Sequence, residues 1–403
     1  MKASQPSNPL KISLLVHDLS VSGAARWGGN RPFLLYQALK QLGHEVQILG
    51  FIFGDESPSE AVASQFPLTV IQGEHFPQFW NSAQQLAQAI TGDILYAQQP
   101  RVTTLGIALW QKFLTHKPLI LDIDDWVLGW YGGDELKYPE SLRQFARDLI
   151  KPEGALRYPE HPFYLKWSEK FVKYADSVTI HTQFLQNRFG GIYVPNGKNT
   201  HQFNPQKYDA QASRKQYDLQ DYRILMFPGA PRPYKGLEDI LNALDLLDQS
   251  DLRLVIVGGS PYDDYDKKLR EKWGRWLIQL PIQPVEKMPE LVAAAHIVIV
   301  PQRDTPITQA QFPLKLTDGM SMAKPVIATR MGDLPEVLGD TGFLVEPSSP
   351  SEIAETIKVI FSDYDAALQR GQQARKRCIQ WYSLDAMSHS LDQVLQTVTQ
   401  KSS

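Results

Sequence analysis

Short apolar runs alternate with segments of helical apolar spacing along most of this chain, and no other feature constrains its fold as strongly. Runs such as Pro118–Ile123 and Ile297–Val300 are nearly continuous in apolar side chains, as strands buried on both faces are. Helical patterns such as Phe33–Leu42 separate them. Strands that alternate with helices predict βαβ units and parallel sheets, so we expect an α/β protein.

The expected strands fall into two groups, which indicates two domains in a chain of 403 residues. The first group is Lys11–His17, Glu45–Gly50, Asp93–Ala97, Pro118–Ile123, Ser177–His181 and Gly191–Val194. The second group is Arg223–Phe227, Arg253–Gly258, Trp276–Leu280, Ile297–Val300 and Pro325–Thr329. Residues 203–221 between them are polar and have no apolar period. We therefore expect a domain at 1–202, a linker at 203–221 and a second domain at 222–382.

Composition argues against several classes of protein. The net charge is −3 with scattered basic residues, so we expect no nucleic-acid partner. The single cysteine, Cys378, excludes an intrachain disulfide and a cysteine-rich zinc cluster. Met1–Pro9 is polar, and no stretch reaches the ~18 apolar residues of a membrane span. We expect a cytoplasmic protein without a transmembrane segment, and peripheral contact with the inner membrane surface stays open.

The motif Gly229-Ala-Pro-Arg-Pro-Tyr-Lys-Gly236 follows an apolar strand and precedes a helix. It places Arg232 and Lys235 where a strand ends and a helix begins, which is where cations and free N–H groups can bind a pyrophosphate. Its two prolines stiffen the loop and reduce the entropy lost when an anion binds. The alternative is a pair of solvated surface cations.

The segment Phe312–Asp318 leads into a second helix that begins near a strand end. Asp318 is placed to accept hydrogen bonds from both hydroxyls of a ribose, although the helix dipole alone also favours a carboxylate there. If Pro313 ends the loop, backbone N–H groups of the next residues can reach phosphates. These residues are Leu314, Lys315, Leu316 and Thr317. Cations and a ribose carboxylate together indicate a nucleoside diphosphate site.

These two motifs resemble those of the retaining glycosyltransferases of the group 1 type (family 4). In one branch of that family the second motif reads K-L-x-E-x-M-A-x-G-x-P-V, and this chain has its counterparts Lys315, Leu316, Asp318, Met320 and Pro325-Val326. The resemblance covers the C-terminal half nearly end to end and the N-terminal half in outline. It implies a GT-B fold of two Rossmann-like domains facing across a cleft. It also implies that a helix at 383–403 packs back on the N-terminal domain.

The resemblance implies a hexosyltransferase (EC 2.4) that moves a sugar from a nucleoside diphosphate sugar to an acceptor hydroxyl with retention. The acceptor would be a glycan, a lipid-linked molecule or a small molecule. The donor would be of the UDP or GDP type, and no further cofactor and no metal are expected. We expect a front-face reaction in which Arg232 and Lys235 stabilise the leaving diphosphate. Asp318 in place of Glu, together with Ala310, leaves the alternative of a non-catalytic nucleotide-sugar-binding protein. Another GT-B enzyme, such as a nucleotide-sugar epimerase or a phosphorylase, is a further alternative.

Further site residues are expected at glycines near other strand ends. Gly28 and Gly29 lie between the first strand and helix, where the resemblance implies a loop that meets the donor phosphates. Gly229 opens the Arg232 motif and is expected to contact the donor as well. The motif G-x-G-x-x-G is absent, which counts against a dinucleotide-binding protein.

The acids of Asp122-Ile-Asp124-Asp125-Trp126 end the strand Pro118–Ile123. Ligands gather at the carboxyl ends of parallel strands, so we expect Asp124 or Asp125 to bond to sugar hydroxyls and place Asp124 in the catalytic set. A divalent metal site and a helix cap are the alternatives. Trp126 would stack on a sugar or belong to the core of an inserted segment.

Three weaker expectations complete the set. His181 ends a strand and is either structural or an acceptor-side residue. Asp304 could replace the second acid of the family motif, whose position here is Ala310. Residues 137–173 mix basic and aromatic side chains, which is typical of a membrane-facing patch or of a solvated surface.

Overall fold

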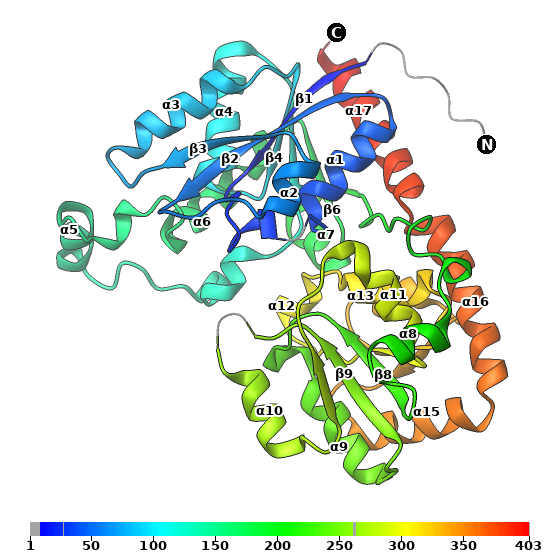
Figure 1. Ribbon diagram of the computed structural model, residues 1–403. Helices are drawn as coiled ribbons and strands as arrows, with labels where there is room; N and C mark the ends of the chain where they lie inside the picture. Colours follow the sequence, from blue (N-terminus) through cyan, green and yellow to red (C-terminus); the bar gives the residue numbers. More distant parts are fainter. Residues whose placement is uncertain (1–8, 27, 261–262, 403) are drawn as a thin grey trace. The chain divides into compact units, whose positions relative to one another are not determined.

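The computed structural model describes residues 9–26, 28–260 and 263–402 (Figure 1). The chain divides into two compact units. The first unit comprises Met1–Pro195 and Met387–Ser403, and the second comprises Asn196–Ala386. Each unit contains one parallel sheet with helices packed on it, as the alternation of strands and helices predicts.

The first unit has a seven-stranded sheet in the order β3-β2-β1-β4-β5-β6-β7. Its strands are β1 Lys11–Val16, β2 Glu45–Phe53, β3 Leu68–Gly73, β4 Ile94–Gln98, β5 Leu119–Ile123, β6 Ser177–Ile180 and β7 Ile192–Tyr193. The central strands β4 and β5 are buried along their whole length. Their carboxyl ends therefore bring Gln98 and Asp122, which are paired in register, to the same edge of the sheet.

Helices connect the strands of the first unit. They are α1 Arg31–Gln41, α2 Glu60–Gln65, α3 Phe79–Ala89, α4 Ile107–Thr115, α5 Leu142–Ile150, α6 Pro162–Ser168 and α7 Gln183–Phe189. The terminal helix α17 Leu384–Ser402 buries the stripe Met387, Leu391, Val394, Leu395 and Val398. It lies beside α1, where Ser388 Oγ donates to the Ala38 carbonyl at 3.1 Å (Figure 1).

The second unit has a six-stranded sheet in the order β10-β9-β8-β11-β12-β13. Its strands are β8 Arg223–Pro228, β9 Leu252–Val257, β10 Leu277–Leu280, β11 Ile297–Val300, β12 Val326–Thr329 and β13 Phe343–Val345. Its helices are α8 Ala210–Gln216, α9 Leu237–Leu247, α10 Tyr265–Trp273, α11 Met288–Ala294, α12 Pro306–Gln309, α13 Leu314–Ser321, α14 Leu334–Leu338, α15 Pro350–Ser362 and α16 Tyr364–Trp381.

Two strands, β3 and β13, lie outside the sequence-based expectation, and both are edge strands. Most residues of β3 are only partly buried or exposed, and Val70 is 39% exposed. Strand β13 has only three residues. An edge strand needs no continuous apolar run, because water or a neighbouring helix covers part of its surface. The period that identifies central strands is therefore absent from both.

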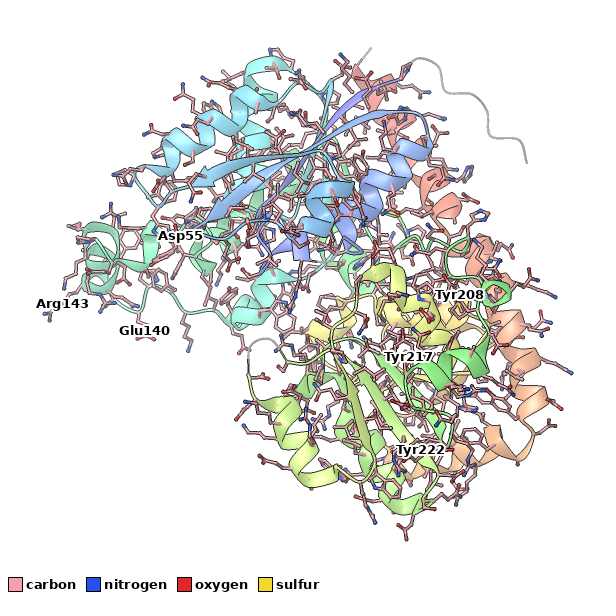
Figure 2. The ribbon with its side chains drawn as sticks, in the orientation of Figure 1. Asp55, Glu140, Arg143, Tyr208, Tyr217 and Tyr222 are labelled. Carbon is pink, nitrogen blue, oxygen red and sulfur yellow. The ribbon has the colours of Figure 1, made fainter. Side chains whose placement is uncertain are left out.

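The segment expected as a linker, 203–221, contains helix α8 and lies within the second unit. Phe203 and Leu219 are buried in the core of that unit, which also includes Met226 of β8 and Val292 of α11. Tyr208, Tyr217 and Tyr222 pack against the same core (Figure 2). The few apolar residues are too widely spaced to give a period, but they are sufficient to fix the segment by tertiary packing. No helix among the described residues is long and apolar enough to cross a membrane.

Candidate functional site

The loop after β8 carries the first motif of the second unit. Strand β8 ends at Pro228, and a single 3₁₀ turn, Pro233–Lys235, precedes helix α9. Gly236 begins α9 with φ of 69°, and a Cβ there would overlap the carbonyl oxygen of Pro301, which follows β11. Only glycine lets the loop pass so close to its neighbour, so this position fixes the path of the motif.

Two lysines, the half-buried Lys235 and the buried Lys315, approach the same aromatic ring at this strand end. Lys315 Nζ lies 4.6 Å from the centre of the Phe227 ring, and Lys235 Nζ lies 6.0 Å from it. Lys235 also donates to the Ala230 carbonyl at 2.9 Å. Burial, and then the charges of Lys315 and Arg232, hold the pKa of Lys235 well below its usual range. Burial lowers the pKa of Lys315 to about 8.

Like charges that are half-buried or buried favour an anion as their partner. Desolvation and mutual repulsion disfavour the protonated amines, and a bound diphosphate would relieve both effects. Arg232 extends the group toward the loop after β9. Its Nη1 lies 3.4 Å from Ser260 Oγ and 3.6 Å from the Asp263 carboxylate. The side chain of Arg232 is 15% exposed.

Helix α13 begins at Leu314 directly after Pro313, as the motif predicts. The first N–H groups of a helix have no intrahelical acceptor, which suits this end for an anion. Gly229 lies close to the helix, because a Cβ there would be 3.7 Å from Lys315 Cε. Leu316 is fully buried, and the Thr317 hydroxyl donates to the Leu314 carbonyl at 2.9 Å.

Asp318 accepts a hydrogen bond from Lys198, a residue that sequence reasoning does not select. The two side chains are 10% and 12% exposed, and Lys198 Nζ lies 4.3 Å from the Phe203 ring. Lys198 directly follows the Pro195-Asn-Gly197 turn, and that turn is the one sequence signal that could have pointed to it. The carboxylate expected to hold a ribose is therefore oriented by an ammonium group of the same unit.

Asp304 is hydrogen-bonded to a residue outside this group. It is exposed on the loop before α12 and accepts from Gln309 Nε2 at 2.7 Å. The structure thus brings Gly229, Lys235 and Lys315 together at the end of β8. The roles expected for these residues, for Arg232 and for Asp304 stay predictions.

In the first unit, the Asp122 carboxylate is fully buried and hydrogen-bonded to other buried side chains. Its carboxylate accepts from Arg31 Nη2 at 2.8 Å and Nε at 3.0 Å, and from the Thr179 hydroxyl at 2.6 Å. Arg31 also donates to the Val194 and Pro195 carbonyls at 3.0 and 3.1 Å. The Arg31–Asp122 pair therefore joins the start of α1 to the ends of β5 and β7. The part of the chain that the structure describes has no group of three or more His, Cys, Asp or Glu side chains that could hold a metal ion.

Asp124 is half-buried beyond the end of β5 and is bonded by two amides that sequence reasoning misses. Gln98 Nε2 donates to its carboxylate at 3.2 Å, and Gln99 Nε2 donates to the other oxygen. Burial, and then the nearby charge of Asp122, raise the pKa of Asp124 to about 7. The backbone of Gln99 has φ of 69°, an uncommon conformation for a residue other than glycine. Such strain is often found at functional sites.

Trp126 belongs to the core of the inserted segment, which was one of its two expected roles. It is 9% exposed, and its ring lies 5.6 Å from Phe184 and 4.5 Å from the Arg188 guanidinium. These neighbours cover most of the ring, and stacking of Trp126 on a sugar stays a prediction. Asp125 instead accepts from the exposed Trp130, whose Nε1 lies 3.0 Å away.

His181 and Gly28 also have local structural surroundings. His181 is 3% exposed, and burial, with the charge of Arg31, lowers its pKa well below the usual value. Gly28 has φ of 65°, and a Cβ there would lie 3.2 Å from the Phe66 ring. Gly29 continues the same loop, for which phosphate contact stays a prediction.

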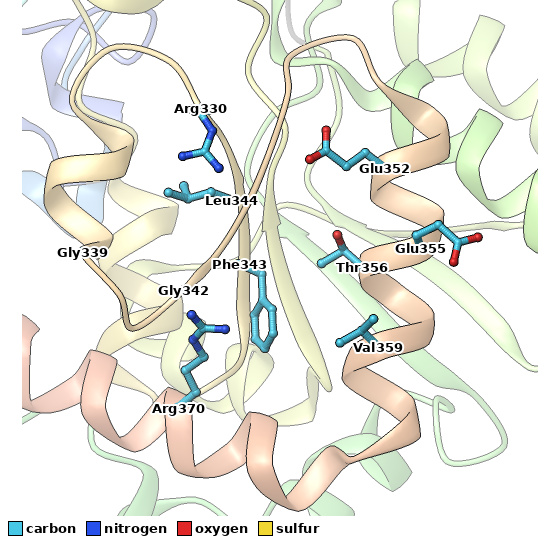
Figure 3. A pocket seen from close by; sticks show the side chains of 10 residues that line it. All are labelled: Arg330, Gly339, Gly342, Phe343, Leu344, Glu352, Glu355, Thr356, Val359 and Arg370. Carbon is cyan, nitrogen blue, oxygen red and sulfur yellow. The ribbon is translucent and has the colours of Figure 1, made fainter.

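A cavity of about 410 Å³ lies elsewhere in the second unit, beside the edge strand β13. Figure 3 shows Arg330 and Glu352 on opposite sides of its opening. Arg370 stacks on Phe343 at 4.6 Å on its floor. None of the residues expected to bind a donor lines this cavity.

Comparison with known proteins agrees with the motifs. Residues 222–363 match the family model described as "Glycosyl transferases group 1". These residues form a group 1 glycosyl transferase domain. The domain includes β8 through β13, so it contains Arg232, Lys235, Lys315 and Asp318.

Curated relatives match part of the chain. D-inositol 3-phosphate glycosyltransferase of Corynebacterium efficiens is 28% identical over 164 residues, which are 38% of this chain and 38% of that protein. A GDP-mannose-dependent α-(1-6)-phosphatidylinositol monomannoside mannosyltransferase of Mycobacterium tuberculosis is 24% identical over 232 residues, or 54% of this chain and 60% of that protein. The chain thus spans less than half the length of the first of these relatives.

Solved structures match nearly the whole chain. HepE from Anabaena, solved with UDP, is 18% identical with a TM-score of 0.72 over 96% of this chain and 100% of that chain. A glycosyltransferase from Rickettsia africae is 19% identical with a TM-score of 0.72 over 98% and 99% of the two chains. This likeness confirms the expected GT-B fold around the group 1 domain.

Proposed function

We propose that the protein is a glycosyltransferase that moves a sugar from a nucleoside diphosphate sugar to an acceptor hydroxyl. The observation that carries the proposal is the pair of amines, Lys235 and Lys315, held with Arg232 at the end of β8. A doubly charged diphosphate supplies the negative charge that this arrangement favours. The group 1 domain around these residues and the glycosyltransferases that resemble it support the same activity.

Each residue of the group has a proposed role. Arg232 and Lys235 bind the two phosphates of the donor, and Lys315 adds positive charge beside the first turn of α13. Asp318 accepts hydrogen bonds from the ribose hydroxyls, with its carboxylate oriented by Lys198. The donor is of the UDP or GDP type. HepE has been solved with UDP and with UDP-glucose, and the mycobacterial relative is named as GDP-mannose-dependent.

The proposed reaction is a front-face displacement with retention. The bond between the anomeric carbon and the phosphate oxygen breaks, and the acceptor oxygen bonds to the same face of that carbon. The proton of the acceptor hydroxyl passes to the leaving phosphate oxygen. Arg232 and Lys235 stabilise the negative charge that develops on the diphosphate. Asp124, with a pKa of about 7, accepts a hydrogen bond from an acceptor hydroxyl when it is ionised and can donate one when it is protonated.

A ligand panel tests the donor site. Melting temperatures are measured with UDP-, GDP-, ADP- and dTDP-sugars and with the bare diphosphates. We expect one nucleotide class to raise the melting temperature, and we expect Arg232→Ala and Lys235→Ala to lose the increase. Arg275→Ala is the matched control, because Arg275 is a 59% exposed cation of the same unit, paired with Asp245. Loss of the increase in the control variant, or no response to any ligand, would contradict the proposal.

A turnover assay separates the enzyme from its alternatives. With the donor identified, released nucleoside diphosphate is measured with and without candidate acceptors, and NMR of the product gives its anomeric configuration. Ligand binding without turnover for any acceptor would favour a non-catalytic binding protein. An altered free sugar without acceptor would favour an epimerase, and inversion at the anomeric carbon would exclude the front-face reaction.

A further inference from the structure

The backbone of Gln99 is held in a rarely adopted conformation directly after β4. Its φ of 69° carries an energetic cost for a residue other than glycine. Three hydrogen bonds fix this conformation. The Gln99 N–H donates to the Asp122 carbonyl at 2.7 Å. The Gln99 carbonyl accepts from the Thr104 hydroxyl at 2.7 Å and from the Arg101 N–H at 2.9 Å. These bonds fix the direction in which the Gln99 side chain leaves the backbone.

The amide groups of Gln98 and Gln99 share one hydrogen-bond partner, the Asp124 carboxylate. Gln98 Nε2 donates to Oδ2 at 3.2 Å, and Gln99 Nε2 donates to Oδ1. The two glutamines are 5% and 4% exposed, and their Oε1 atoms have no hydrogen-bond partner among the residues that the structure describes. A buried amide oxygen without a partner lowers stability, as a strained backbone does. What this arrangement achieves is a donor on each oxygen of one carboxylate.

Asp124 differs from Asp122, the other acid at the end of β5. The Asp122 carboxylate is fully buried and paired with Arg31, so its charge is compensated within the core. Asp124 is half-buried, and no cation of the described residues lies within ion-pair distance of it. Neutral amides stabilise a carboxylate by hydrogen bonding without cancelling its charge. The charge of Asp124 therefore stays available to a hydrogen-bond donor from outside the protein.

Several charged groups influence the protonation of Asp124. Those that face it are Asp122, Asp125, Arg31 and Arg101. Burial, and then the charge of Asp122, raise the pKa of Asp124 to about 7. Arg31 and the Gln99 amide oppose this rise, whereas Asp125 adds to it. Without the amides the carboxyl group would be protonated over a wider pH range.

We propose that Gln98 and Gln99 are positioning residues, which orient the Asp124 carboxylate and hold it ionised so that it accepts a hydrogen bond from the acceptor hydroxyl. The two amides act through Asp124 and do not contact the acceptor. The role of Asp124 toward an acceptor rests on the proposed glycosyltransferase activity. The orientation and ionisation of the carboxylate do not rest on that activity, so they can be tested without a substrate.

An NMR titration of the full chain with isotope-labelled aspartate carboxyl carbons tests the proposal. The signal that disappears in Asp124→Asn identifies Asp124. We expect Gln98→Met and Gln99→Met each to raise the pKa of Asp124 by about half a unit or more, because each removes a donor that favours the ionised form. Gln111→Met is the matched control, since the half-buried Gln111 amide donates to the Ala87 carbonyl at 3.2 Å and not to a carboxylate. It should leave the pKa of Asp124 unchanged.

The pH dependence of turnover gives a second readout, which a merely structural role would not change. With an acceptor identified, the midpoint of the kcat profile that Asp124→Asn abolishes should move to higher pH by the same shift as the NMR titration gives. The KM for the donor should change by less than about twofold, because the donor cations lie in the other unit. If one methionine variant does not fold, the other decides, since each amide is bonded to a different oxygen of Asp124.

The proposal is overturned if neither methionine variant raises the pKa of Asp124, or if Gln111→Met raises it equally. A raised pKa with an unchanged kcat profile would also overturn it. Absence of turnover in the wild type would instead contradict the proposed function, and the NMR titration would still decide whether the two glutamines hold Asp124 ionised.

Discussion

Lys198 donates a hydrogen bond to the Asp318 carboxylate and so ties the segment after β7 to helix α13 within the second unit. Both side chains are largely buried, and Lys198 also lies over the Phe203 ring. An aspartate is one methylene shorter than the glutamate of the resembled motif. The ammonium group of Lys198 gives the shorter carboxylate a fixed orientation. We expect this ion pair to contribute to the stability of the protein and to donor binding.

Removing the carboxylate is the first test of this pair. Asp318→Ala leaves Lys198 buried without its partner, so we expect the free energy of unfolding to fall by about 3 kcal/mol. We also expect nucleoside diphosphate affinity to fall at least tenfold, because a charged acceptor for the ribose is lost. Denaturant unfolding and calorimetric titration measure the two effects. Asp318→Glu is the control, and it should retain binding. Unchanged affinity in Asp318→Ala would exclude the ribose role.

Proton uptake on donor binding is the second prediction. Burial lowers the pKa of Lys315 to about 8, and a diphosphate nearby would raise it again. At pH 8 we therefore expect binding to take up about half a proton at Lys315, and affinity should fall as the pH rises from 7 to 9. Calorimetric titration in buffers of different ionisation enthalpy gives the uptake. Lys315→Met should take up fewer protons than the wild type. Equal uptake by both would show that Lys315 does not respond to the ligand.

The free energy of unfolding should depend on pH because of Asp124. Its pKa is raised from 3.8 in an unfolded chain to about 7, so between these values the folded state binds more protons. The contribution of Asp124 to stability is therefore present at low pH and is lost as the pH rises through 7. We expect the wild type to lose roughly 2–3 kcal/mol relative to Asp124→Asn between pH 5 and 8. Urea unfolding at both pH values measures the difference. Parallel pH profiles for the two proteins would contradict it.

The two tryptophans of the inserted segment should differ in their effect on stability. Trp126 is 9% exposed between Phe184 and Arg188, and Trp130 is 40% exposed. We expect Trp126→Ala to lower the free energy of unfolding by about 3–5 kcal/mol, because it leaves a cavity. Trp130→Ala should cost about 0.5 kcal/mol or less. Denaturant unfolding compares them, and a small cost for both would argue against the core role of Trp126.

The fold could be read largely from the sequence because buried parallel strands require continuous apolar runs. Central strands such as β8 and β11 lie within a residue of their expected bounds. The edge strands β3 and β13 could not be read in this way, since their partly exposed residues have no such run. The packing of Phe203 and Leu219 was equally hidden, because isolated apolar residues show no period.

The sequence by itself determined the α/β class, the GT-B resemblance and the positions of Arg232, Lys235 and Asp318 at strand or helix ends. These depend on local spacing, which a chain carries in its order of residues. Only the tertiary structure decided which side chains are hydrogen-bonded to one another. It paired Arg31 with Asp122, Lys198 with Asp318 and Gln99 with Asp124, across 91, 120 and 25 positions. Such relationships depend on which strand ends lie side by side in a sheet and which side chains are buried together, and no local pattern encodes them.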